Sequence, residues 1–423
     1  MTKLVATSEG ERQSRLVGTG LALRLMLSGT VFAISLLPFA FSQYMRQSAG
    51  LIVAVLISEH LRNLALYLCC VFRGHQRNQY EALSLSVERV GCLLGGWLLL
   101  RAGFGTYAIG FLYLFSRLAS LTVAVAIYAR RFVSPTLNLN RDMLQRIRTE
   151  TYPLAVLVIC ERVNMYLPPI LVTVIAGQFV TGIFQAAFKA VMPAVLLSTA
   201  VAGSLYAPMA SRFAQDPAAS ARLYHAGVRG LLHLLLPAAV ITILLPQQVI
   251  LVLYGAEYLP AAPVLQWLTP YFISIIFIAI NHLFMPAIDR QKIVGIVSVI
   301  SVVLNVMLGV WLIRMWQATG AALSLVLAQA IVATVYITLA QRYGRAALKL
   351  HEWCAIALSF AVAFLAVGAL RAELSARPIL ALLEGSGLSA LAYFLTLAVL
   401  RGVSTDERNA LRRITGKLLP KPA

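Results

Sequence analysis

Long apolar runs alternate with short polar segments along this chain. The apolar runs are about twenty residues long, the length at which an α-helix crosses about 30 Å of hydrocarbon. They predict twelve membrane-spanning helices, at 21–42, 49–72, 83–101, 106–129, 152–176, 181–208, 230–253, 263–285, 293–313, 318–340, 353–370 and 382–400. The run at 83–101 is the least regular, because Glu88 and Arg89 interrupt it.

The composition excludes a soluble protein of this length. Of the 423 residues, 60% are hydrophobic and only 12% are charged, and the mean hydropathy is +0.82. A soluble fold needs more polar surface than this to cover its core. A membrane β-barrel is excluded as well, since its strands would be shorter and would alternate apolar with polar residues. We therefore predict an all-α polytopic membrane protein.

The net charge of +19 is distributed unevenly over the polar segments. If the N-terminus is cytoplasmic, the segments on that side carry 24 Lys and Arg residues, and the opposite side carries 5 (Arg46, Arg101, Arg314, Arg371 and Arg377). Cytoplasmic loops of membrane proteins are enriched in Lys and Arg. We therefore expect both termini in the cytoplasm and an even number of spans, and the charge requires no nucleic-acid partner.

Eight charged side chains lie deep inside the predicted spans, in spans two to six: Glu59, Arg62, Glu88, Arg89, Arg117, Glu161, Arg162 and Lys189. A charge in hydrocarbon costs several kcal/mol unless it has a partner or a water-filled cavity. Cations outnumber carboxylates, so one interpretation is a basic cavity near the membrane midplane that attracts a phosphate or diphosphate. Gln185, on the same helix face as Lys189, and Asn164 would extend its lining.

The alternative interpretation of these charges is structural ion pairing. Glu59 and Arg62 are three residues apart, so they share a helix face and can pair. Neighbours such as Glu88 and Arg89 point in different directions from a helix and are less suited to neutralising each other. Both interpretations stay open at the level of the sequence.

Signatures of catalysis are lacking in this sequence. It contains neither H-E-x-x-H nor G-x-S-x-G, and no G-x-x-x-x-G-K-[ST] for nucleotide binding. The 6 histidines are scattered without ligand spacing, and the 5 cysteines lie in apolar runs. We expect a protein that is not an enzyme and that holds no metal or cofactor.

Three segments of the chain resemble a known superfamily in their order and spacing. They are L-V-L-Y-G-A-E-Y-L-P-A-A-P-V-L-Q-W-L (Leu251–Leu268), A-G-Q-F-V-T-G-I-F-Q-A-A-F-K (Ala176–Lys189) and A-P-M-A-S-R-F (Ala207–Phe213). They resemble the multidrug/oligosaccharidyl-lipid/polysaccharide (MOP) exporter superfamily, in its branch of O-antigen-type flippases for lipid-linked oligosaccharides. The resemblance is strongest over 150–345.

This resemblance implies two helical lobes that work by alternating access. We assign an N-terminal lobe of four spans to 1–130, a basic cytoplasmic linker to 131–151, a C-terminal lobe of six spans to 152–345, and an accessory helix pair with a basic tail to 346–423. Members of the family have six spans before the linker, so the first helical hairpin is expected to be lacking here. Asn164 stands where the family often has an aspartate.

The function implied by the resemblance is transport of a polyprenyl-diphosphate-linked glycan, such as a lipopolysaccharide O-antigen precursor, across the bacterial inner membrane. The residues expected to bind it are Arg62, Arg89, Arg117, Arg162, Lys189 and Gln185, while Glu59, Glu161 and Asn164 would balance charge or couple transport to protons. Membrane lipids and a polysaccharide polymerase or glycosyltransferases are the further expected partners. Two alternatives stay open: an ion-coupled multidrug or metabolite exporter, and a non-transporting component of a polysaccharide assembly complex.

Overall fold

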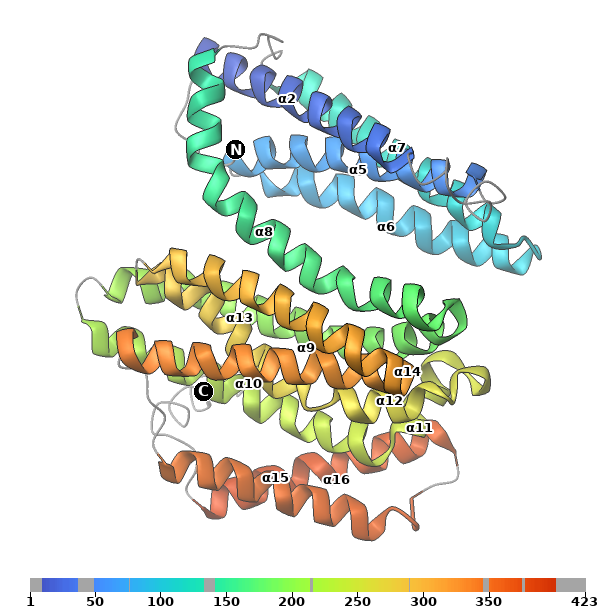
Figure 1. The fold of residues 1–423 in the computed structure, drawn as a ribbon, viewed down its shortest axis with the longest axis vertical. Helices are drawn as coiled ribbons and strands as arrows, with labels where there is room; N and C mark the ends of the chain where they lie inside the picture. The colour runs from blue at the N-terminus through green and yellow to red at the C-terminus, as the bar shows by residue number, and fades with distance from the viewer. Residues whose placement is uncertain are drawn as a thin grey trace, which may run out of the picture. The chain divides into compact units, whose positions relative to one another are not determined.

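The computed structural model describes residues 10–36, 49–75, 77–132, 141–213, 216–288, 290–344, 350–374 and 377–400. Within these ranges the chain is helical apart from short turns, and it contains no strand (Figure 1). The predicted all-α fold class is therefore confirmed. The end of the first predicted span (37–42), part of the basic linker (133–140) and the tail at 401–423 lie outside the described residues.

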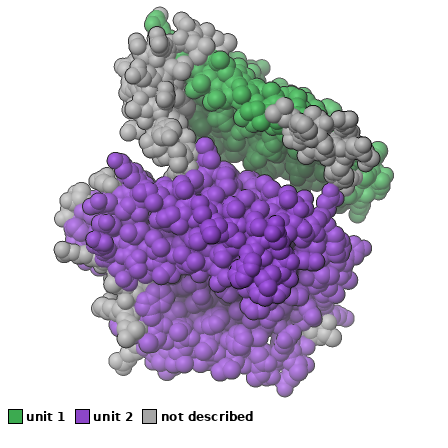
Figure 2. All heavy atoms as spheres, in the orientation of Figure 1, with its two compact units in different colours: residues 1–152 green, residues 153–423 purple. Residues whose placement is uncertain are grey.

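Two compact units divide the chain, residues 1–152 and residues 153–423, coloured green and purple in Figure 2. Unit 1 contains α2 (Gly10–Leu36), α5 (Ala49–Gly74), α6 (Asn78–Arg101), α7 (Thr106–Arg131) and the first part of α8 (Arg141–Ala176). In unit 1, α7 packs against both α5 and α6. All four predicted spans of this region are present.

Helix α2 begins at Gly10, well before the predicted start of the first span at residue 21. The early start follows from packing rather than from hydrophobicity. Leu16 and Val17 are almost fully buried, and the hydroxyl of Tyr67 in α5 donates a hydrogen bond to the carbonyl oxygen of Val17, at 2.7 Å. Tertiary contacts of this kind extend a helix beyond the limit that its apolar run indicates.

Unit 2 holds the remaining helices. They are the rest of α8, α9 (Gln178–Phe213), α10 (Pro217–Leu244), α11 (Pro246–Tyr254), the 3-10 helix η1 (Ala256–Tyr258), α12 (Ala261–Leu268), α13 (Tyr271–Ala287), α14 (Gln291–Gly344), α15 (Leu350–Leu370) and α16 (Pro378–Val399). Helix α13 is apolar on nearly all its faces and is buried along almost its whole length, as expected for a helix surrounded by others. It packs against α9 and α14.

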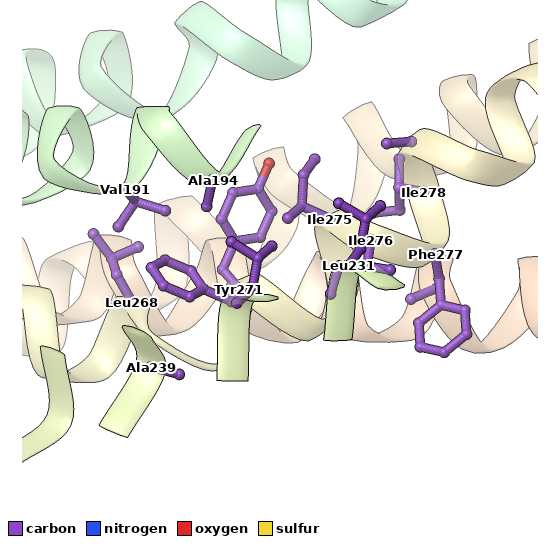
Figure 3. Close-up of a cluster of buried hydrophobic side chains, with 14 of the residues drawn as sticks. Val191, Ala194, Leu231, Ala239, Leu268, Tyr271, Ile275, Ile276, Phe277 and Ile278 are labelled. Atoms are coloured by element: carbon purple, nitrogen blue, oxygen red, sulfur yellow. The ribbon is translucent and has the colours of Figure 1, made fainter. Parts of the chain in front are cut away.

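The apolar core of unit 2 forms where α9, α10, α12 and α13 meet. Figure 3 shows side chains from all four, including Val191 of α9, Leu231 of α10, Leu268 of α12 and Ile276 of α13. Each of these four side chains is at most 2% exposed. Close packing of this kind fixes the helices that carry polar groups elsewhere in the unit.

Helix α14 is far longer than one membrane crossing requires. Its backbone breaks at Trp316 and Gln317, where Gln317 has a φ of 49°, and this break lies between the predicted spans at 293–313 and 318–340. A Cβ atom on residue 320 would collide with the carbonyl oxygen of Leu312, so Gly320 allows the two halves to approach at the turn. Helix α14 therefore supplies two spans.

The number of spans agrees with the prediction. Ten of the described helices are long and apolar enough to cross a membrane when α14 is counted once, and α12 and α13 form one further span that is bent by 49°. Counting α14 as two spans, the described residues contain twelve.

One predicted helix is divided. The span predicted at 230–253 does not form a single helix, because α10 ends at Leu244 and α11 begins at Pro246. Proline has no backbone N–H to continue the ladder of helical hydrogen bonds. After α11, Gly255 adopts a φ of 86°, a conformation that favours glycine, and this starts the turn into η1.

The pair α15 and α16 is fastened to α10 by polar contacts. Nη1 of Arg229 lies 2.8 Å from Oε1 of Glu352, and the side chains of this pair are 4% and 18% exposed. A hydrogen bond of 3.0 Å joins His233 to the hydroxyl of Tyr393. The hydroxyl of Ser389 donates to the carbonyl oxygen of Pro237, at 3.0 Å. These contacts explain why the pair belongs to unit 2.

We predict that Glu352→Ala destabilises unit 2 by about 3 kcal/mol, because it leaves the buried Arg229 guanidinium without its carboxylate. Thermal unfolding of the purified protein in detergent measures the loss. Arg222→Ala is the matched control, since it removes one member of an exposed pair with Asp216, at 3.2 Å, and such pairs contribute at most about 1 kcal/mol. Equal unfolding temperatures for the two variants would contradict this role for the buried pair.

Candidate functional site

Three packed helices of unit 1 bring four charged side chains together. Glu59 and Arg62 come from α5, Glu88 from α6 and Arg117 from α7. All four were identified in the sequence as charges inside predicted spans, and the structure places them in one group. We call this group the four-charge cluster.

Arg117 lies at the centre of the four-charge cluster and is only 6% exposed. Its Nη2 lies 2.8 Å from Oε1 of Glu59, and its Nε lies 3.5 Å from Oε1 of Glu88. Its Nη1 donates a hydrogen bond of 2.6 Å to the hydroxyl of Ser58. The guanidinium therefore contacts all three helices, and the buried charge is compensated as the low-dielectric interior requires.

Arg62 is held less closely than Arg117. Its Nη1 lies 3.9 Å from Oε2 of Glu59, and its Nε lies 3.7 Å from Oε1 of Glu88. The side chains of Arg62 and Glu59 are 35% and 47% exposed, whereas Arg117 and Glu88 are buried. The cluster thus has a buried half that holds the helices together and a half that is accessible from the surface of unit 1.

The charges of the four-charge cluster cancel, because it contains two arginines and two glutamates. Structural pairing therefore describes these residues better than a basic excess does. The accessible half can still exchange partners, since the side chains of Glu59 and Arg62 are partly exposed. An exposed ion pair contributes little free energy, so little free energy is lost when one partner is replaced by another.

Polar contacts extend from the four-charge cluster along α5 towards α2. Nη2 of Arg24 in α2 donates to Oδ1 of Asn63, at 3.2 Å. A hydrogen bond of 2.9 Å joins the hydroxyl of Ser28 to Nδ1 of His60. Helix α2 is thereby attached to α5 by hydrogen bonds as well as by apolar packing.

Unit 2 contains a cavity of about 480 Å³ between α8, α9, α13 and α14. Much of its wall is apolar. The polar side chains that line it are Glu161, Arg162, Asn164, Thr199, Tyr271, His282, Ser298, Ser301, Gln329 and Tyr336. A largely apolar pocket with a few polar groups is the usual form of a small-molecule site.

The ionisable pair in this cavity is Glu161 and His282. Nδ1 of His282 lies 2.8 Å from Oε1 of Glu161, and the ring of His282 meets that of Tyr336 edge to face, with 5.5 Å between the ring centroids. Because the carboxylate of Glu161 accepts this hydrogen bond, Nδ1 of His282 carries the proton. Arg162 lines the same cavity.

A neutral network joins α8 to α14 on another side of the cavity. Oδ1 of Asn164 accepts hydrogen bonds from the hydroxyl of Ser301, at 3.1 Å, and from Nδ2 of Asn305, at 3.0 Å. Nε2 of Gln329 donates to the same Ser301 hydroxyl, at 3.3 Å. Asn164 is thereby used in holding two helices together, as buried polar groups usually are.

The structure divides the site residues predicted from the sequence into three groups. Glu59, Arg62 and Arg117 lie in the four-charge cluster of unit 1, and Glu161, Arg162 and Asn164 line the cavity of unit 2. The other three lie in neither place: Arg89, Lys189 and Gln185. Arg89 and Lys189 are exposed. Among the described side chains, no three His, Cys, Asp or Glu converge to hold a metal ion.

Several residues of these sites were not selected from the sequence. The sequence marked Glu88 only as a charged residue inside a predicted span. Nothing in the spacing of Ser58 or His282 along the sequence indicated that either belongs to a site. Ser301 and Asn305 lie four residues apart, so they share a helix face, but this spacing is equally common in helices that only pack. Only the assembled helices show which of these groups meet.

Comparisons with known proteins agree with this architecture. Residues 75–263 match a family described as "Polysaccharide biosynthesis protein", and no curated protein matches the chain. Among solved structures, the lipid II flippase MurJ in an inward closed conformation superposes with a TM-score of 0.77 at 15% identity, over 94% of this chain and 86% of that one. The chain has the fold of this solved flippase.

Two solved transporters of the MOP superfamily superpose less closely. A MOP superfamily transporter from Pyrococcus furiosus gives a TM-score of 0.59 at 15% identity, over 82% of each chain. An outward-facing multidrug resistance transporter of the MATE family gives a TM-score of 0.59 at 14% identity, over 82% of this chain and 81% of that one.

The resemblance inferred from the sequence is thus confirmed, although the family match starts earlier than the expected region of 150–345. The expected lack of a first hairpin stays a prediction.

We predict that Arg117→Met lowers the stability of unit 1 by about 3 kcal/mol, because Glu59 loses its cationic partner at 2.8 Å and the buried Glu88 keeps only the contact with Arg62 at 3.7 Å. Unfolding of the purified variant in detergent measures this loss. The double variant Arg117→Met with Glu88→Gln should recover part of it, since the second change removes the uncompensated charge. A double variant less stable than Arg117→Met would argue against pairing as the reason for the loss.

Proposed function

We propose that this protein carries a lipid-linked oligosaccharide or polysaccharide precursor across a bacterial cytoplasmic membrane by alternating access. The main support is a match to a polysaccharide biosynthesis family within a chain that has the fold of the lipid II flippase MurJ. Ionisable groups within the spans of both units add support, because such groups commonly lie on transport pathways.

The four-charge cluster is the proposed contact for the diphosphate of the lipid carrier. It is neutral with Glu59 and Glu88 ionised, so it gains positive charge only if a carboxylate takes up a proton or moves away. Glu59 is the accessible carboxylate of the two. We therefore assign the exchange to Glu59: a phosphate oxygen takes its place at Nη2 of Arg117 and beside Arg62.

The finer features of the substrate and its surroundings belong to the same proposal. The carrier is of the polyprenyl diphosphate type, and the glycan is of the O-antigen or lipopolysaccharide class. Arg162 in the cavity of unit 2 and the outlying Arg89, Lys189 and Gln185 are proposed to contact the glycan. Both termini are cytoplasmic, the protein catalyses no covalent reaction, and a polymerase or glycosyltransferases work beside it.

A multidrug or metabolite exporter is the second candidate, and the cavity of unit 2 favours it. Its wall is mostly apolar and includes one carboxylate, Glu161, and one guanidinium, Arg162, which suits an amphiphile with a polar end. MATE transporters share the fold. A non-transporting role in a polysaccharide assembly complex is the alternative if neither substrate is moved.

We predict that Arg62→Gln reduces glycan translocation at least about tenfold, the effect of losing one charge-assisted hydrogen bond to the diphosphate. Translocation is measured as lipid-linked glycan that reaches the outer leaflet, at equal protein abundance. Arg101→Gln is the control, because Arg101 ends α6 and lies over the ring of Trp97, at 4.4 Å from its centroid. Normal translocation by Arg62→Gln would exclude the cluster as the diphosphate site.

The second predicted effect concerns proton coupling at Glu161 and His282. In proteoliposomes with an imposed pH gradient, we expect His282→Gln to transport at a rate that no longer responds to the gradient, because the variant removes the imidazole nitrogen that shares a proton with the Glu161 carboxylate. Tyr336→Phe is the control, since it keeps the ring contact and should keep the response. A gradient response retained in His282→Gln would place coupling outside this pair.

A further inference from the structure

A second pocket lies in unit 1, apart from the four-charge cluster, where α2, α5, α6 and α7 meet. Its volume is about 430 Å³, within the range of small-molecule sites. It is formed where α5 turns into α6 and where α7 ends. The charge distribution along the sequence assigns both of these segments to the cytoplasmic face.

Aromatic rings give this pocket a fixed wall. Phe132, directly after α7, stacks on Tyr128 with 5.6 Å between the ring centroids, and it meets the ring of His75 at 4.9 Å and that of Tyr80 at 6.4 Å. All four rings line the pocket. Because Phe132 links the end of α7 to the α5–α6 turn, the wall is held from both sides.

Two arginines line the pocket from opposite segments, Arg77 before α6 and Arg131 at the end of α7. Neither forms an ion pair with any described residue. Nearby Arg73 differs, since its Nε lies 2.9 Å from Oε2 of Glu81. The backbone of Arg77 is fixed, because its N–H donates to the carbonyl oxygen of Phe72, at 2.9 Å, and its own carbonyl oxygen accepts from Tyr80.

Among the described side chains no carboxylate lines the pocket, so the described wall carries positive charge from its arginines. Two guanidinium groups provide forked donors that match phosphate oxygens. Tyr80 adds a hydroxyl, and the rings offer an apolar surface beside them. A cation would be repelled, and an uncharged apolar ligand would make no use of the two guanidinium groups.

We propose that this pocket binds a phosphate group, held between Arg77 and Arg131. Two sources share this chemistry: the headgroup of an anionic phospholipid in the cytoplasmic leaflet, and a soluble phosphate. Basic pockets between membrane helices on the cytoplasmic side commonly take lipid phosphates. The site is independent of the substrate that the protein transports.

The test is calorimetric titration of the purified full-length protein in a neutral detergent. The probes are dioctanoyl phosphatidylglycerol, inorganic phosphate, and dioctanoylglycerol, which lacks the phosphate. We expect Arg131→Gln to weaken binding of the phosphate-bearing probe about tenfold or more, as one lost charge-assisted hydrogen bond implies. Arg77→Gln with Arg131→Gln should remove it. Arg130→Gln, an exposed neighbour that does not line the pocket, should leave it unchanged.

The outcomes separate the two sources and the opposing explanations. Tighter binding of phosphatidylglycerol than of inorganic phosphate identifies a lipid site, and equal binding identifies a soluble ligand. Equal losses in Arg130→Gln and Arg131→Gln would overturn the proposal, because general surface charge would then explain binding. The proposal would also be overturned if neither phosphate probe bound, or if dioctanoylglycerol bound and the same arginine substitutions weakened its binding. Unfolding temperatures show whether each variant is folded, which excludes misfolding as the cause of lost binding. The double variant Arg77→Lys with Arg131→Lys is a further control: it keeps the charge and should bind phosphate more weakly than the unmodified protein.

Discussion

The pairing of Arg117 with carboxylates is the constraint on which unit 1 depends. A guanidinium that is almost fully buried costs several kcal/mol unless partners replace its hydration. Glu59 from α5 and Glu88 from α6 are those partners, so the three helices can pack only in a register that brings these side chains together. The groups that fix the packing are also the groups that we assign to the substrate. Stability and binding at this place therefore cannot be altered independently, except at the accessible Arg62.

Unit 2 meets the same constraint by other means. Asn164, Ser301 and Gln329 satisfy one another without charge, and only Glu161 and His282 form an ionisable contact in the cavity. A neutral network tolerates burial at lower cost than an ion pair does. It holds α8 and α14 in place while the ionisable pair remains open to the cavity. Among the described residues that line the cavity, charge changes are thereby confined to one contact.

The thickness of the membrane made most of the fold predictable, because it sets the length of every apolar run. It does not set where helices begin or break: the start of α2 at Gly10 depends on contacts with α5, and α10 stops before Pro246. The pairing of Glu59 with Arg62 could be anticipated from their spacing on one helix. The pairing of Arg117 with Glu59 could not, since it depends on how α7 packs against α5. His282 is a lone histidine in sequence and meets Glu161 only in the folded unit.

The central claim is that this protein moves a lipid-linked glycan between membrane leaflets. Its most direct test is a measurement of that glycan in each leaflet, in cells that carry the gene, in cells that lack it, and in the latter after the gene is restored. Without the gene, the glycan should accumulate on the cytoplasmic side, and the restored gene should return it to the outer leaflet. The same distribution in all three would contradict the account.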